Sequence, residues 1–385
     1  MNVMAFQEPW RRNNTDPKKG QLHEGDHIHD AFELHFSDGV NVIIGENGTG
    51  KTTLLKMIYA ATQWSIEQTN AGKTDKFHKF FSNSISDSDL LKNDARKQGY
   101  CGFEVSDGEH KFWYSLSHKA FFNLDNWLGL DIQSVFIPTT EMLSHSKGFL
   151  ALNEKFKMPF DGTQIDIIVN ASLPEARTLP DYMDAVLEQI SNAIDGTVIQ
   201  ENDTFYVVKK DGRKIDFSLE AEGLRKLALL WKLIRNGLLE SGTILLWDEP
   251  ESNLNPELFP LVAKILLELA QHGIQIFLAT HSYNFAKYLE LLRATKEQVQ
   301  FHNLFKGTSE LPDTLAGSSP IDDYRDDVIY SNSAFSMEEL HPNHLMNADE
   351  KLLDMVYEEK VSGKLPGHIR MRIRSFNLIF PRRSL

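Results

Sequence analysis

A glycine-rich run between residues 41 and 53 carries the side chains best suited to bind phosphate. It reads NVIIGENGTGKTT, and residues 45–52 satisfy the pattern G-x-x-x-x-G-K-[ST] in full. The glycines let backbone N–H groups turn toward phosphate oxygens, and a helix beginning at the lysine adds its positive N-terminal end. We expect Lys51 to reach the β- and γ-phosphates and the Thr52 hydroxyl to bind Mg²⁺. The nucleotide-binding residues predicted here are Asn47, Gly48, Thr49, Gly50, Lys51, Thr52 and Thr53.

An acidic pair after a second apolar run could complete this site. In TILLWDEP, apolar residues lead directly to Asp248 and Glu249. Asp248 is placed to hold Mg²⁺, and Glu249 to orient and deprotonate an attacking water. His281 ends a third apolar run, IFLATHS, and could hydrogen-bond the γ-phosphate. The alternative interpretation of these residues is a solvated acidic turn and a structural histidine.

Buried strands must position these residues at one edge of a sheet. Unbroken apolar runs alternate with helical patterns, which is typical of a parallel sheet covered on both faces. The predicted core elements are two strands within 31–44, a helix from 51 to about 64, strands at 133–137, 243–247 and 274–280, and a helix around 257–271.

Smaller elements are expected to form inserted lobes. A hairpin is predicted over 100–117 around Asp107-Gly108, a good turn pair. Residues 65–98 are polar and irregular, and residues 138–180 are expected to be rich in loops. Further predictions are a helix over 181–194, two or three short strands over 197–217, and an apolar helix from about 223 to 239.

Composition limits the classes of function. The chain has 385 residues, 41% of them hydrophobic, with a net charge of −14 and no apolar run of about 18 residues. We therefore expect no membrane span, and no general attraction to nucleic acid. The single cysteine, Cys101, and an N-terminus without a secretory signal favour the cytoplasm. Residues 364–385 form a basic tail, with one Lys, five Arg and no acidic residue, which would dock a partner, lie in solvent or touch DNA.

Three segments together resemble the ABC-type ATPase head, in the branch that includes SMC-like, RecF-like and OLD-like bacterial ATPases. They are NVIIGENGTGKTTLL, ILLWDEPESNLNPEL and IFLATHS, and looser similarity extends over roughly residues 25–305. The resemblance implies an α/β P-loop NTPase fold, with a parallel core sheet, an antiparallel β subdomain and a small α-helical insertion. It also implies ATP and Mg²⁺ as cofactors.

The resemblance further implies a signature segment that completes the ATP site of a partner subunit. The best match is Ala221-Glu222-Gly223, with Gly223 facing the partner's nucleotide and alanine at Ala221 where serine is usual. The contact could instead involve Ser218, Arg225 or Lys226. For the Q-loop of this family, the segment QSVFIPTTEM lies in the right order along the chain, and Gln133 and Glu141 are both possible.

Such heads work as pairs, in which ATP closes the dimer and hydrolysis opens it. The implied domains are a head over 1–300, with an insertion at about 65–130 and a signature-helix lobe at about 140–240. Residues 301–385 would form a C-terminal extension that completes the head and ends in the basic tail.

Several outputs are compatible with such a switch. The segments PTTEMLSHSKGF and HPNHLMNADEKLLDMVYEE are similar to compact ATPases of bacterial anti-phage systems, which act with a separate nuclease or toxin. The main alternative is a RecF- or SMC-like ATPase of DNA repair or recombination. A transporter motor and an OLD-like nuclease are less favoured. The only acidic cluster suited to the nuclease consists of Asp322, Asp323, Asp326 and Asp327.

Overall fold

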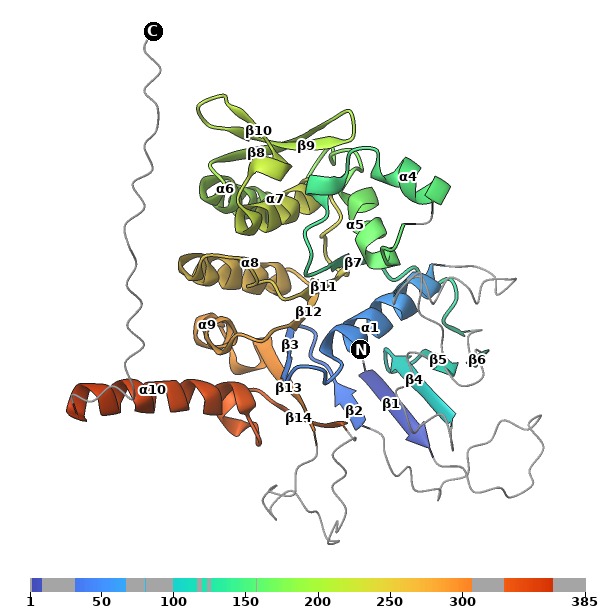
Figure 1. Cartoon of the computed structure of the whole chain (residues 1–385). Coiled ribbons are helices and arrows are strands. Elements are labelled where there is room, and N and C mark those ends of the chain that lie inside the picture. Colours follow the sequence, from blue (N-terminus) through green and yellow to red (C-terminus); the bar gives the residue numbers. More distant parts are fainter. Residues whose placement is uncertain are drawn as a thin grey trace, which may run out of the picture. The chain divides into compact units, whose positions relative to one another are not determined.

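The computed structural model describes most of the chain (Figure 1). The basic tail, the acidic cluster at 322–327 and much of the predicted 65–130 insertion lie outside the described residues. The chain divides into two compact units, Met1–Leu345 and Met346–Leu385. The described residues are 2–8, 32–66, 80, 100–115, 120–122, 126–156, 158–306 and 329–362.

A sheet of six strands forms the core of the first unit, in the order β14-β13-β3-β12-β11-β7. All neighbours run parallel except the β13–β14 pair, which is antiparallel. Asp248 pairs in register with Ala279, and Ala279 with Ile43, so the carboxyl ends of three strands meet at one edge. The strands are β3 (Val40–Gly45), β7 (Ser134–Ile137), β11 (Ile244–Asp248), β12 (Gln275–Ala279), β13 (Val299–Lys306) and β14 (Ile329–Ala334).

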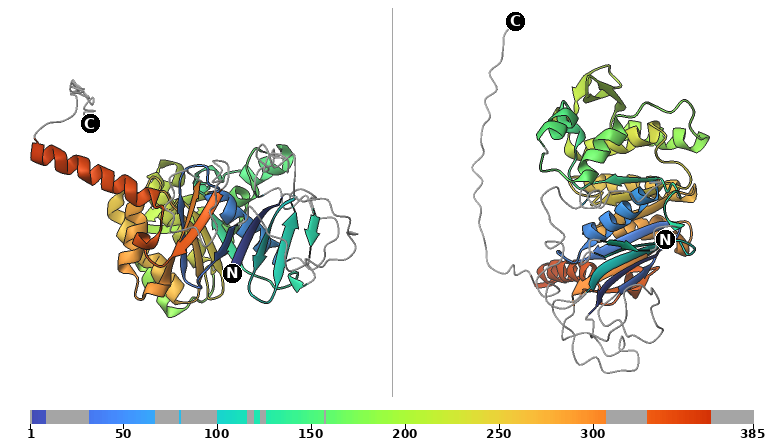
Figure 2. Two further views of the ribbon diagram at one scale, coloured as in Figure 1. Left: turned by 90° about the horizontal axis from the view of Figure 1, so that it is seen from below. Right: turned by 90° about the vertical axis from the view of Figure 1, so that its right-hand side faces the viewer.

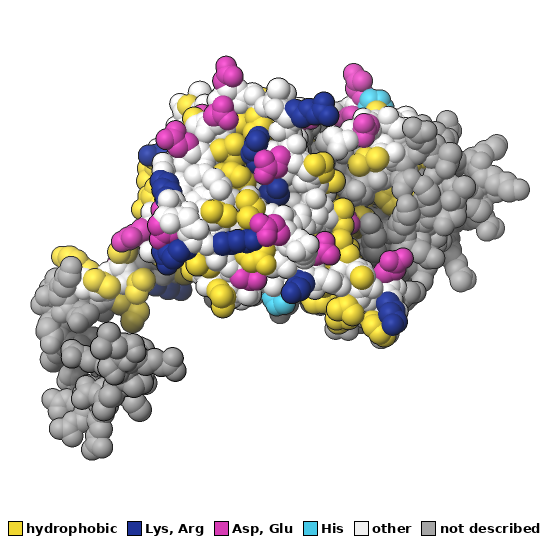
Figure 3. All heavy atoms as spheres, turned by 90° about the horizontal axis from the view of Figure 1, so that it is seen from above, with side chains coloured by type: hydrophobic (Ala, Val, Ile, Leu, Met, Phe, Trp, Pro, Cys, Tyr) yellow, Lys and Arg dark blue, Asp and Glu magenta, His cyan; other side chains and the backbone are white. Residues whose placement is uncertain are grey.

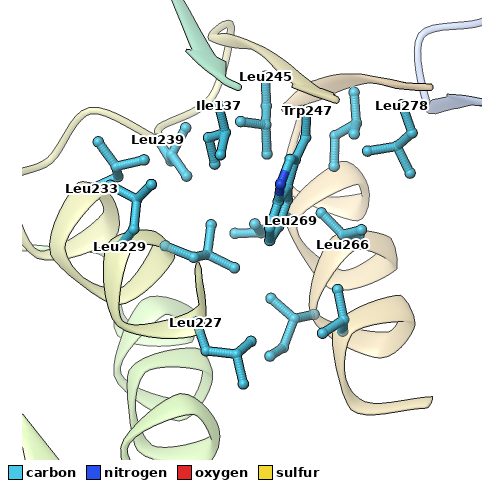
Figure 4. Close-up of a cluster of buried hydrophobic side chains, with 14 of the residues drawn as sticks. Ile137, Leu227, Leu229, Leu233, Leu239, Leu245, Trp247, Leu266, Leu269 and Leu278 are labelled. Carbon is cyan, nitrogen blue, oxygen red and sulfur yellow. The ribbon is translucent and has the colours of Figure 1, made fainter. Parts of the chain in front are cut away.

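The central strands β11 and β12 are buried on both faces, as their apolar runs predicted. Side chains alternate along each strand, so that Leu245 and Trp247 face one hydrophobic cluster and Ile244 and Leu246 face the other. In Figure 4, Trp247 points from β11 between two helices that carry leucines toward it. These helices are α7 (Glu222–Arg235) and α8 (Phe259–Gln271).

Helix α1 (Lys51–Ser65) and an antiparallel sheet cover the other face, which confirms the predicted β subdomain. The Trp127 indole donates to the Ala61 carbonyl at 2.8 Å, so the helix and the loop after this sheet are joined by a buried hydrogen bond. The sheet has the order β2-β1-β4-β5-β6, with β1 (Asn2–Glu8), β2 (Phe32–His35), β4 (Tyr100–Ser106), β5 (Lys111–Ser115) and β6 (Ala120–Phe122).

A lobe of helices and three short strands extends from the α7 side of the core sheet (Figure 2). The expectation of a loop-rich segment before residue 181 was wrong, because two helices form there. One of them begins with a capping box, in which Asp161 and Gln164 satisfy each other's backbone N–H groups. The lobe contains α4 (Phe149–Phe156), α5 (Gly162–Ala171), α6 (Asp181–Ala193), α7, β8 (Gly196–Glu201), β9 (Thr204–Lys209) and β10 (Lys214–Asp216).

Helix α7 ends four residues before the predicted position. It stops at Arg235 because Gly237 adopts a left-handed backbone conformation, with φ 75°, which closes the helix.

On the face shown in Figure 3, acidic and basic side chains are interspersed rather than separated by sign.

The remaining described helices are α9 (Tyr283–Leu292), which packs on α8, and α10 (His344–Ser362). Most of α10 belongs to the second unit. Within the described residues, no helix has the length and apolar character needed to cross a membrane.

Candidate active site

The glycine-rich loop joins the end of β3 to the start of α1. Gly45, Gly48 and Gly50 all have positive φ angles, of 146°, 79° and 89°. A Cβ at Gly45 would lie 2.1 Å from the carbonyl oxygen of Leu304 on β13, so this position also lacks space for a side chain. The loop can therefore take the strained path over the sheet edge only with glycine at these positions.

Lys51 lies folded into this loop. Its Nζ donates to the carbonyl oxygens of Gly45 and Glu46, each at 2.8 Å, and the residue is 5% exposed. Burial lowers the pKa of Lys51 to about 8, although Glu249, Asp248 and other nearby carboxylates oppose the shift.

The loop has the features of an anion site. Gly50 is the N-cap of α1 and provides no side-chain cap, and the first turn of α1 has no acidic residue. The N-terminal end of α1 and the Lys51 ammonium therefore face the loop without a competing carboxylate of the helix itself, which fits the phosphates of a nucleotide.

Asp248 lies at the centre of a group of oxygen ligands. The Thr52 hydroxyl donates to its Oδ2 at 2.9 Å, and the Thr139 hydroxyl donates to the same oxygen at 2.8 Å. Hydroxyl and carboxylate oxygens are the hard ligands that Mg²⁺ takes, with phosphates and waters supplying the rest. In the described part of the chain, no group of three His, Cys, Asp or Glu residues could hold a metal ion by itself.

Thr139 was missed by the sequence analysis. It follows β7, whose carboxyl end lies beside that of β11, so a threonine after this strand was a usable signal. The Q-loop residues suggested from the sequence lie elsewhere. Gln133 precedes β7, at the opposite end of the strand, and donates to Asp131. Glu141 is buried and pairs with Arg225, at 3.4 Å from Nε to Oε2.

Glu249 and His281 face each other across the ends of β11 and β12. The His281 Nε2 lies 3.6 Å from the Glu249 Oε1, and both side chains are about one-third exposed, at 35% and 32%. Burial and the neighbouring Lys51 lower the pKa of His281, which favours the neutral imidazole, whereas the Glu249 and Asp248 carboxylates oppose the shift. The pair is therefore a carboxylate beside a neutral imidazole, both open to solvent, which suits the activation of water.

The backbone at Glu249 is strained. Its φ is 49°, in a region that non-glycine residues rarely occupy. The Glu249 N–H donates to the Ala279 carbonyl at 2.9 Å, and its own carbonyl accepts from the Lys226 ammonium at 3.0 Å. These bonds hold the Glu249 backbone in this conformation and so set the direction in which its side chain leaves the turn.

Helix α7 touches the turn after β11 within the same chain. A Cβ at Gly223 would lie 2.6 Å from the Asn253 carbonyl oxygen, so a close backbone approach requires glycine there. Lys226, which is 2% exposed, also donates to Ser252 in this turn. Ala221 is the exposed N-cap and has no side-chain cap. Of the residues suggested for the signature contact, Ser218 bonds Asp216 instead.

Comparison with known families identifies the domain. A family model described as "AAA domain, putative AbiEii toxin, Type IV TA system" matches residues 71–286, which include Asp248, Glu249 and His281. The chain belongs to this AAA-domain family. The glycine-rich loop of this AAA domain precedes the matched residues. No match was found among curated proteins.

Solved structures resemble the AAA domain at low identity. The SMC head domain from Thermotoga maritima is 16% identical, covers 79% of this chain and 93% of its own, and has a TM-score of 0.37. An Smc head from Pyrococcus furiosus, bound to the C-terminal domain of ScpA, is 10% identical, with coverages of 92% and 98% and a TM-score of 0.38. The dimeric ABC transporter cassette MJ0796 is 12% identical, with coverages of 79% and 94% and a TM-score of 0.32.

Proposed function

We propose that this AAA domain binds and hydrolyses ATP with Mg²⁺. The observation that carries the proposal is the convergence of the glycine-rich loop, Thr52 and Thr139 on Asp248, with Glu249 and His281 beside them. Each residue then has a separate task. The loop backbone and Lys51 would bind the phosphates. Thr52 and Asp248 would hold Mg²⁺, with Thr139 bonding the Asp248 carboxylate, and the metal would supply charge neutralisation at the transferred phosphoryl group.

Glu249 is the general base of this proposal. Its side chain leaves a strained turn at the carboxyl end of β11 and is one-third exposed, so its carboxylate can accept a proton from a water at the edge of the sheet. The lowered pKa of His281 favours the neutral imidazole, which can donate one ring N–H to the γ-phosphate. Removing the Glu249 charge should therefore affect turnover far more than ATP binding.

The site is half of a pair in this proposal. The start of α7, with Ala221 exposed at its N-cap and Gly223 in its first turn, would close over the nucleotide of a second copy of the chain. ATP would hold two chains together, and hydrolysis would release them. The change between paired and separate chains would then be the signal that the protein passes to a partner.

Steady-state ATPase measurements test the enzymatic part. The wild-type chain should hydrolyse ATP only with Mg²⁺, Lys51→Ala should lose ATP binding, and Glu249→Gln should bind ATP while its turnover falls by roughly 10²–10⁴-fold. Normal turnover in Glu249→Gln would refute the assignment of the base. An absence of ATP binding to the wild-type chain would refute the proposal as a whole.

For the biological role, we propose the regulatory ATPase of a bacterial anti-phage or toxin–antitoxin system, acting in the cytoplasm with a separate nuclease or toxin. The family description, which names a putative AbiEii toxin and a type IV system, supports this direction. Co-purification with the products of adjacent genes, followed by nuclease and toxicity assays with and without ATP, tests it. A partner from DNA replication or repair would favour the alternative role in repair, and DNA binding that falls steeply with salt would add to it.

A further inference from the structure

Glu251 has no part in the chemistry described above, yet its side chain is buried at the edge of the active site. It lies two residues after Glu249, in the turn that follows β11. Its Oε1 accepts hydrogen bonds from the Thr280 hydroxyl at 2.6 Å and from the His281 N–H at 3.0 Å. One carboxylate oxygen thus joins the turn after β11 to the end of β12, which carries His281.

The contact continues into the segment beyond His281. The Thr280 hydroxyl, which donates to Glu251, accepts from the Ser282 N–H at 3.0 Å. The Ser282 hydroxyl in turn caps α9, because it accepts from the Phe285 N–H at 3.2 Å. The backbone on both sides of His281 is therefore held by a chain of hydrogen bonds that begins at Glu251.

The second carboxylate oxygen of Glu251 gains no hydrogen bond from its burial in the part of the chain that the structure describes. Oε2 is buried and has no hydrogen-bond partner among the described residues. Burial raises the pKa of Glu251, and the nearby Glu249 carboxylate adds to this, while the bonds from Thr280 and His281 oppose it. A buried carboxyl with one unsatisfied oxygen is costly for stability, so its presence beside the active site fits a task there.

We infer that Glu251 is a positioning residue, which holds His281 against Glu249 through its bonds to Thr280 and the His281 backbone. The inference rests on the proposed hydrolysis for its kinetic consequences but not for its geometry. Only Oε1 makes the two bonds, so a glutamine, whose amide oxygen can accept both, should serve almost as well. An alanine should not.

Two matched pairs of variants test this inference in the full chain. Glu251→Ala removes both bonds and Thr280→Val removes the one from the hydroxyl, whereas Glu251→Gln keeps an acceptor and Thr280→Ser keeps a hydroxyl in place. We expect kcat to fall about 10- to 100-fold in Glu251→Ala and in Thr280→Val, with KM for ATP unchanged. A small displacement of a reacting group has an effect of that size. In Glu251→Gln and Thr280→Ser, kcat should stay within about 3-fold of the wild-type value by the same reasoning.

A double variant separates positioning from a general loss of structure. His281→Ala with Glu251→Ala should be no slower than His281→Ala alone, because Glu251 would act only through His281. The inference would be overturned if the loss of kcat in the double variant equalled the product of the two single losses. A Glu251→Gln variant as slow as Glu251→Ala would overturn it too. If Glu251→Ala does not fold, the Thr280 pair gives the same decision.

Hydrogen exchange measured by mass spectrometry gives a readout that does not need turnover. Without nucleotide, Glu251→Ala should speed the exchange of amides in a peptide covering residues 280–286, and Glu251→Gln should not. Unchanged exchange in Glu251→Ala would overturn the inference even if the chain is an ATPase. If the wild-type chain proves inactive toward ATP, the proposed function fails, and the exchange result still decides the role of Glu251.

Discussion

Binding of ATP should take up a proton at Lys51, and this sets a measurable pH dependence. Burial lowers the pKa of the free ammonium to about 8. Phosphates next to it would favour the charged form and raise this pKa again. As the pH rises through 8, the free protein loses the charge that the complex requires, so affinity falls. From the two-state titration, the affinity for ATP should drop by roughly 10-fold between pH 7 and pH 9, with an uptake of ~0.5 proton at pH 8 and ~0.9 at pH 9.

Isothermal titration calorimetry in buffers of different ionisation enthalpy measures this uptake directly. ATP itself contributes little above pH 7.5, because phosphate groups lose their last proton at a pKa of about 6. Lys51→Arg is the matched control, since arginine stays charged over this range, and its remaining affinity should not depend on pH. A constant affinity of the wild-type chain, with no proton uptake up to pH 9, would refute the reasoning about the buried lysine.

Three further predictions concern the elements around the site. Burial lowers the pKa of His302 in the folded chain to about 3, from 6.5. As the pH drops from 6.5 to 5, His302 is protonated in the unfolded chain but not in the folded chain, so the free energy of unfolding should fall by about 2 kcal/mol. Urea midpoints measure this, and His302→Gln should flatten the dependence. Gly223→Ala should lower the free energy of unfolding by about 1–3 kcal/mol, because its Cβ would meet backbone atoms, whereas Ala221→Gly at the exposed N-cap should change it by a few tenths. Thr139→Val should raise the Mg²⁺ concentration for half-maximal ATPase about 10-fold, and Thr139→Ser should not, if Thr139 supports the metal through Asp248.

The core of the fold could be predicted because local and long-range signals agree there. The runs before Asp248 and His281 are mostly apolar, as strands buried on two faces must be, and each leads to polar residues at the carboxyl edge of the sheet. Loop glycines identify the phosphate site in the same way, since each must adopt a backbone conformation that other residues avoid.

Contacts between distant segments could not be predicted from the same patterns. Thr139 reaches Asp248 across 109 residues of sequence, and no spacing rule connects them. Glu251 carries no pattern of its own, and only the pairing of β11 with β12 brings it to Thr280. Helix α5 was missed for a different reason. Its capping pair, Asp161 and Gln164, was a local signal that went unused.

The central claim is that this AAA domain forms half of an ATP site that a second copy closes. Sedimentation of Glu249→Gln with Mg²⁺ and either ATP or ADP tests it most directly. We predict a species of twice the 44.0 kDa of one chain with ATP, and a single chain with ADP or when Lys51→Ala is added. The same mass with ATP and ADP, in a protein shown to bind both, would contradict the claim.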